Sequence, residues 1–145
     1  MAKLGSRAGW SGNYCHDLTA TTSLTPGDSG KVFFLNSATE FTTTLPSVAD
    51  AGAGFNVKFI VKAAPSSANY VISEKGASDT NVIIVNGISE LETDDGEDGV
   101  SNTGCTFINF IDSVAIAGDW VELICDGTNW YATGQTKADG GVTAT

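Results

Sequence analysis

The sequence has few basic residues, a single histidine and no long hydrophobic run. Among its 145 residues, 7 are Lys or Arg and 17 are Asp or Glu, which gives a formal net charge of −10 at pH 7. A nucleic-acid partner is therefore not expected, because contact with phosphates requires a dense basic surface. No stretch approaches the roughly 20 apolar residues of a membrane-spanning helix. Residues 1–10 also lack the apolar run of a secretory signal, so we expect a soluble protein that is made in a cytoplasm and has no membrane partner.

Cysteine is also sparse, with only Cys15, Cys105 and Cys125 in the chain. An odd number of cysteines cannot all pair within one chain, and none of them forms a CxxC motif. A disulfide scaffold, a structural zinc site and a thioredoxin-like redox centre are therefore poorly supported. We expect the three side chains to be small buried or semi-buried thiols.

Residues typical of catalytic centres are equally scarce. The only histidine, His16, lies between Cys15 and Asp17, but neighbours in sequence usually point apart and do not form a catalytic dyad. The nucleophile elbow GxSxG, the zinc motif HExxH, the phosphate-binding P-loop and the dinucleotide motif GxGxxG do not occur. We therefore predict that the protein is not an enzyme and uses no cofactor. A small β-sandwich lyase stays open as an alternative, which the single histidine disfavours.

The chain does contain 41% hydrophobic residues and 17 glycines, enough for one domain with a hydrophobic core. The clearest strand covers residues 55–62, because Phe55, Val57, Phe59 and Val61 alternate with residues that would lie on the opposite face. Short apolar or alternating segments predict further strands over residues 32–35, 41–45, 70–73, 82–85, 106–111, 120–125 and 130–133.

Glycine-rich turns separate these segments. Residues 26–30 form a dense turn signal, Asn86 and Gly87 predict a hairpin turn after residues 82–85, and residues 126–129 predict the loop of the last hairpin. Only residues 47–53 could form a turn or two of helix. With no internal repeat of solenoid or propeller type, this pattern predicts an all-β fold: a single β-sandwich, jelly-roll-like domain or small barrel.

The expected domain covers residues 25–134, preceded by an extended N-terminal arm over residues 1–24 and followed by a flexible C-terminal tail over residues 135–145. The arm has two possible roles: it folds back on its own domain, or it binds a neighbouring subunit. In the second case, its apolar side chains would make the assembly contacts. These side chains are Trp10, Tyr14 and Leu18.

Two segments are candidates for ligand binding. Residues 90–98 are rich in Asp and Glu and would form either a loose calcium loop or a solvated hairpin tip, although they do not fit the EF-hand pattern. The side chains of Trp10, Trp120 and Trp130 could stack on sugars, but aromatic residues in strands are usually core or cross-strand pairs. We therefore expect no metal site, and we expect Trp120 and Trp130 to lie in the core or in a subunit interface.

Three blocks of the sequence resemble small structural proteins of tailed bacteriophages. The first contains GKVFFLNSA followed by FTTTLP, the second contains GFNVKFIV followed by NYVI, and the third is the hairpin GDWVELICDGTNWY. These blocks occupy residues 30–38, 41–46, 54–61, 69–72 and 118–131.

The resemblance covers residues 26–134 and implies a β-rich virion protein. Such modules occur in tail fibres and spikes and in head decoration, or cement, proteins. The chain has neither a repetitive shaft nor a coiled-coil stem, which favours decoration. The expected protein is a homotrimer on the outer surface of the capsid, where it bridges neighbouring major capsid protein subunits and stabilises the expanded capsid. The alternative is a module associated with a tail fibre or spike that binds a host receptor glycan.

Overall fold

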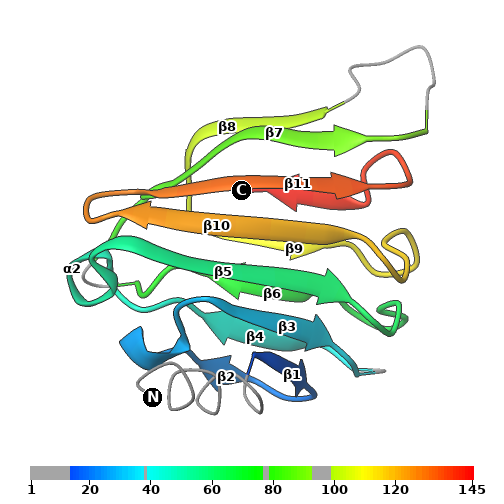
Figure 1. The fold of residues 1–145 in the computed structure, drawn as a ribbon. Coiled ribbons are helices and arrows are strands. Elements are labelled where there is room, and N and C mark those ends of the chain that lie inside the picture. Colours follow the sequence, from blue (N-terminus) through cyan, green and yellow to red (C-terminus); the bar gives the residue numbers. More distant parts are fainter. Residues whose placement is uncertain (1–13, 38, 77–78, 93–98) are drawn as a thin grey trace, which may run out of the picture.

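Two β-sheets form the computed structural model, which describes residues 14–37, 39–76, 79–92 and 99–145. Figure 1 shows them as two layers, with β5 and β10 in the front layer and β6 and β9 behind them. Both sheets mix parallel and antiparallel pairs. Among the described residues each sheet ends at two open edges, so the sandwich expectation is confirmed and no closed barrel forms.

The first sheet has seven strands in the spatial order β1-β3-β5-β10-β11-β7-β8. Its strands are β1 (Cys15–Leu18), β3 (Lys31–Leu35), β5 (Ala53–Val61), β7 (Ile83–Glu90), β8 (Gly99–Cys105), β10 (Trp120–Asp126) and β11 (Trp130–Thr136).

The second sheet has five strands in the order β12-β9-β6-β4-β2. Its strands are β2 (Thr22–Ser23), β4 (Phe41–Thr44), β6 (Tyr70–Ser73), β9 (Phe107–Phe110) and β12 (Val142–Ala144). The helical segments are a 3₁₀ turn, η1 (Pro26–Asp28), and one short helix, α2 (Val48–Ala51). The helix begins after Ser47, whose hydroxyl accepts a hydrogen bond from the backbone N–H of Asp50, and it confirms the helical turn expected within residues 47–53.

The first six strands alternate between the two sheets, so the chain winds around the core. As a result β1, β3 and β5 are parallel neighbours in one sheet, and β2, β4 and β6 are parallel neighbours in the other. The turns of this winding differ in length, since Cys15 pairs with Val32 whereas Lys31 pairs with Val57. Unequal turns leave no fixed sequence period, which explains why a solenoid-like path occurs without an internal repeat.

The core lies between the two layers and follows the period of two. Along β5, the side chains of Phe55, Val57, Phe59 and Val61 are buried, as the alternation predicted. Trp130 of β11 is also fully buried, and its ring meets that of Phe55 edge-on at 5.3 Å. The inward-facing side chains of both sheets thus form one hydrophobic cluster.

The hairpin expected at Asn86 and Gly87 is wrong, because β7 continues through both residues to Glu90. The register of β7 against β8 shifts between Asn86 and Ile88, so this pair marks a β-bulge rather than a turn. Burial of Ile88 in the core favours continuation of the strand over a local reversal.

The ends of the chain differ from the expected boundaries. The described part of the arm folds back on its own domain, because β1 pairs with β3 and β2 pairs with β4. The expected flexible tail also belongs to the domain, since β11 extends to Thr136 and β12 pairs with β9. Val142 is fully buried, which anchors β12 despite the small polar residues around it.

Candidate functional site

The outer face of the seven-stranded sheet carries several apolar side chains, among them the exposed Ile124 and Tyr131. Successive side chains of a strand point to opposite faces, so every strand that fills the core also presents a second set of residues outward. The strand registers place these outward residues in three rows that cross the sheet. We call this surface the outer face and define its rows below.

The first row joins Phe34, Ile60 and Trp120. Phe34 pairs with Ile60 across β3 and β5, and Ile60 pairs with Trp120 across β5 and β10. All three side chains are half-buried, as expected for large groups that lie flat on a sheet with one side against neighbours. They form a continuous apolar strip across three strands.

The second apolar row joins Ile124, Tyr131 and Ile84. Ile124 pairs with Tyr131 across β10 and β11, and Tyr131 pairs with Ile84 across β11 and β7. Ile124 is 48% exposed and Tyr131 is 44% exposed. Exposed apolar side chains that adjoin one another are more typical of binding surfaces than scattered ones, so this row is a candidate contact surface.

A polar row separates the two apolar rows. Lys58 of β5 pairs with Glu122 of β10, which places opposite charges on neighbouring strands. The Lys58 ammonium also lies 3.9 Å from the centroid of the Trp120 ring, a cation–π distance. The middle of the outer face therefore carries one residue of each charge between the two apolar rows.

The rim of the outer face at β1 is also charged. The Lys62 ammonium lies 2.6 Å from a carboxylate oxygen of Asp17, which also accepts a hydrogen bond from Asn36. These two contacts lower the pKa of Asp17, and the contact with Lys62 has the larger effect. A depression of about 320 Å³ lies here, lined by these two charged residues with Cys15 and Phe34.

The outer face of the five-stranded sheet has a different chemistry. Its central row crosses strands β4, β6, β9 and β12 and consists of Thr42, Val71, Asn109 and Thr143. Each of these residues pairs with the next one on the neighbouring strand. This row has one apolar member among hydroxyl and amide side chains. The central row of the five-stranded sheet is therefore more polar than the two apolar rows of the seven-stranded sheet.

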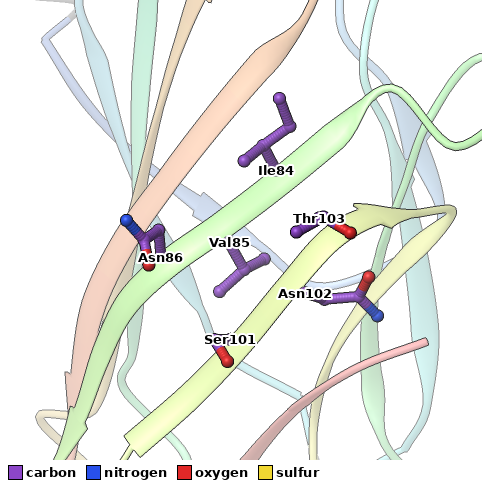
Figure 2. A pocket seen from close by; sticks show the side chains of 6 residues that line it. All are labelled: Ile84, Val85, Asn86, Ser101, Asn102 and Thr103. Carbon is purple, nitrogen blue, oxygen red and sulfur yellow. The ribbon is translucent and has the colours of Figure 1, made fainter.

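A second feature of the outer face is a depression of about 510 Å³ on β7 and β8, beyond the second apolar row. Figure 2 shows the side chains that line it, three from each of these two neighbouring strands. The lining residues are Ile84, Val85, Asn86, Ser101, Asn102 and Thr103.

Two of the three residues predicted to make assembly contacts, Tyr14 and Leu18, lie within the described part of the chain, and they differ in exposure. Leu18 is only 8% exposed and belongs to the hydrophobic core, so it is not available to a neighbouring subunit. Tyr14 is 52% exposed and continues directly into β1 at the sheet edge. Trp10 lies outside the described residues.

His16 and the cysteines behave largely as expected. His16 lies on the inner side of β1, with its ring 5.9 Å from that of Phe33, whereas Cys15 is exposed on the other side. The two side chains therefore do not form a dyad. Cys105 and Cys125 are buried, and burial raises the pKa of the Cys105 thiol to about 11. The exposure of Cys15 differs from the expectation that all three thiols would be buried or semi-buried.

The acidic segment is only partly within the described residues, and residues 93–98 lie outside them. Glu90 is buried and its carboxylate accepts a hydrogen bond from the backbone N–H of Gly140, so its role is to hold β7 against the C-terminal turn. Across the described part of the chain, no three Asp, Glu, His or Cys side chains are grouped so that they could hold a metal ion.

Sequence reasoning missed the two apolar rows. Each strand contained the signal, for example Ile60 between two lysines and Ile124 beside the inward Leu123. The rows form only because β5, β10, β11 and β7 are neighbours, and that order follows from the winding of the chain.

Comparisons with known proteins assign no family, since no protein-family model, no curated protein and no solved structure matches the chain. Within the described residues, no helix has the length and apolar character needed to cross a membrane.

Proposed function

We propose that this protein is a virion structural protein that decorates the outer surface of a bacteriophage capsid. In this role its outer face contacts the major capsid protein, and the domain acts as a homotrimer that bridges neighbouring capsid subunits. The observation that carries the proposal is the pair of apolar rows on the seven-stranded sheet. The resemblance of residues 26–134 to structural proteins of tailed phages supports the same role.

Decoration is a binding function and needs no catalysis. A protein that binds the expanded capsid but not the unexpanded one stabilises the expanded state by linkage. Several contacts made at once by a symmetric trimer turn weak individual contacts into tight attachment. An apolar surface on hydrogen-bonded strands suits this task, because the strands hold its side chains in place before binding.

The charge of the chain agrees with a position outside the shell. A formal net charge of −10 keeps the free protein soluble and repels packaged DNA. The central Lys58 and Glu122 pair on the outer face would make attachment selective for a capsid surface with complementary charges, since charge complementarity contributes mainly specificity and association rate.

Capsid binding by surface variants tests this proposal. We expect Ile124→Glu together with Tyr131→Glu to weaken binding to expanded capsids that lack the protein at least about tenfold, because two exposed apolar contacts are replaced by charge. The matched control is Val71→Glu, which adds a carboxylate to the outer face of the other sheet and leaves binding unchanged. Equal binding by both variants would contradict a role for the outer face.

Localisation on the intact virion tests the role itself. Density in lattice register over the head, seen by cryo-electron microscopy, is the expected result. Density confined to the tail would favour the second candidate, a module associated with a tail fibre or spike that binds a host glycan. The polar depression on β7 and β8 is the observation that favours this candidate.

A further inference from the structure

Four of the six residues that line the depression are outward residues of the antiparallel strands β7 and β8, whereas Val85 is buried in the core and pairs with Asn102. Ile84 and Asn86 lie two residues apart on β7, and Ser101 and Thr103 lie two residues apart on β8, so each pair shares a face. Asn86 pairs directly with Ser101. The four side chains therefore border one concave surface of about 510 Å³, within the range of about 300–1,000 Å³ that is common for ligand sites.

The polar groups of this depression have unused hydrogen-bonding capacity. Among the described residues, the side chains of Asn86, Ser101 and Thr103 make no hydrogen bond to another protein group, and all three are exposed. Asn102 is instead fixed, because its amide donates to the carbonyl of Ala144 and its oxygen accepts from the N–H of Gly104. Because Asn102 pairs with the buried Val85, its side chain belongs to the inward face, and the donors and acceptors available to a ligand are those of Asn86, Ser101 and Thr103.

The backbone around the depression is irregular. The register of β7 against β8 shifts between Ile83 and Val85, and it shifts again between Asn86 and Ile88. Bulges are enriched beside functional sites, because they redirect side chains and interrupt strand pairing. The two register shifts lie close together along β7, next to the residues that line the depression.

The lining also limits the chemistry of the ligand. It contains no Lys or Arg and no Asp or Glu, in a chain with a formal net charge of −10. An anion would find no positive partner here, and a metal cation would find no carboxylate. Amide and hydroxyl side chains that both donate and accept match a neutral molecule with several hydroxyl groups.

From this geometry we propose that the depression binds a neutral carbohydrate. Asn86, Ser101 and Thr103 would hydrogen-bond to its hydroxyl groups, and Ile84 would contact its apolar C–H face. Tyr131 pairs with Ile84 on the neighbouring strand and extends the apolar side of the site. This activity is distinct from capsid decoration; because Ile84 and Tyr131 also belong to the second apolar row, a sugar and the proposed capsid contact would use the same side chains, and the site is open to a sugar on the free protein.

Amide chemical shifts of the purified full chain test the proposal. The probes are neutral trisaccharides built from glucose, mannose or galactose, each added at millimolar concentration, where weak sites begin to fill. We expect at least one probe to give saturable shifts centred on residues 84–86 and 101–103. Glucose 6-phosphate, which carries charge, gives none. Absence of saturable shifts with all three neutral probes, or shifts centred elsewhere, overturns the proposal.

Two variants separate the site from a general surface effect. Asn86→Ala combined with Thr103→Ala removes two ligand contacts, and we expect the dissociation constant for the responding sugar to rise about tenfold. Thr133→Ala is the matched control, because Thr133 is an exposed threonine on the outer face of the adjacent strand β11. Unchanged affinity in the double variant overturns the proposal. Capsid binding is measured separately, so failure of sugar binding does not bear on decoration.

Discussion

The ammonium of Lys58 lies 3.9 Å from the centroid of the Trp120 ring, on the outer face of the seven-stranded sheet. The two residues come from strands β5 and β10, which are far apart in sequence and adjacent in the sheet. The contact joins the polar row to the first apolar row and limits the orientations of both side chains. It therefore gives part of the proposed capsid-binding surface a defined shape before any partner binds.

Replacing Lys58 by methionine removes this cation–π contact and keeps an unbranched apolar side chain. We expect the free energy of unfolding to fall by about 0.5–1 kcal/mol, as for other partly exposed cation–π pairs, and the tryptophan emission to shift. Lys62→Met is the control, because Lys62 lies near Phe34 and Asp17 rather than Trp120. An identical emission shift in both variants would show that the contact does not form in solution.

Neighbouring residues of β10 distinguish the core from the outer face. Leu123 is fully buried, whereas Ile124 is 48% exposed on the opposite face. We expect Leu123→Ala to lower the free energy of unfolding by about 2–5 kcal/mol, and Ile124→Ala to change it by no more than about 0.5 kcal/mol. Denaturant titration of the two variants measures both values. Similar losses would mean that Ile124 is covered, for instance by a second copy of the chain.

Much of the sandwich could be predicted from local pattern. The period of two over residues 55–62 identified β5 and its buried face, and the loop at residues 126–129 identified the last hairpin. Each of these features depends on residues that are close in sequence. Tertiary contacts then agree with the local preference, so the sequence signal is sufficient.

Local pattern failed where a strand is stabilised mainly by its neighbours. Strand β8 contains a single large aliphatic residue, Val100, and lies at a sheet edge, so its sequence carries no clear alternation. Strand β12 is three residues long, and only Val142 is fully buried while the small Ala144 is partly buried against the core. At Asn86 and Gly87 the sequence predicted a turn where the strand in fact continues. A dipeptide suited to a hairpin turn is accommodated there as a bulge in β7.

The apolar rows of the outer face were missed for a related reason. Trp120 and Trp130 flank the last hairpin and were expected to have similar roles, but Trp120 pairs with Gln135 and faces outward, whereas Trp130 pairs with Cys125 and is buried. The face of the sheet on which each tryptophan lies depends on the strand register. A register shift of one residue would move both side chains to the opposite face. The rows of the outer face depend in addition on strand order, which no single segment encodes.

The thiols should differ sharply in reactivity. Cys15 is exposed, and Cys105 and Cys125 are buried. Burial and the nearby Glu74 carboxylate raise the pKa of Cys105 to about 11, and burial also raises the pKa of Cys125. Since the thiolate is the reactive form, we expect one rapidly reacting thiol per native chain at pH 8 with a colorimetric disulfide reagent, and three after denaturation.

A Cys15→Ser variant checks this assignment. It should lose the fast reaction in the native state and keep two thiols that react after denaturation. A fast reaction that persists in the variant would mean that Cys105 or Cys125 opens to solvent on the time scale of the assay.

Asp126 at the loop of the last hairpin should make stability depend on pH in acid. One carboxylate oxygen accepts hydrogen bonds from the backbone N–H groups of Asn129 and Thr128, each at 2.7 Å, and the other accepts from the Tyr131 hydroxyl. These hydrogen bonds lower the pKa of Asp126 below its ordinary value of 3.8, and the bond from Asn129 has the largest effect. The bond to Asp126 also raises the pKa of the Tyr131 phenol.

A lowered pKa in the folded state means that the ionised carboxylate stabilises the fold. This contribution is fully present above the unfolded value of about 3.9 and is lost as the pH falls through the lower folded value. We therefore expect the difference in unfolding free energy between the wild type and Asp126→Asn to be constant above about pH 5 and to shrink below about pH 4. Denaturant titrations from pH 7 to pH 2 measure it. A difference that stays constant down to pH 2 would show that Asp126 titrates alike in the folded and unfolded chains, and that the loop is held by its backbone turn alone.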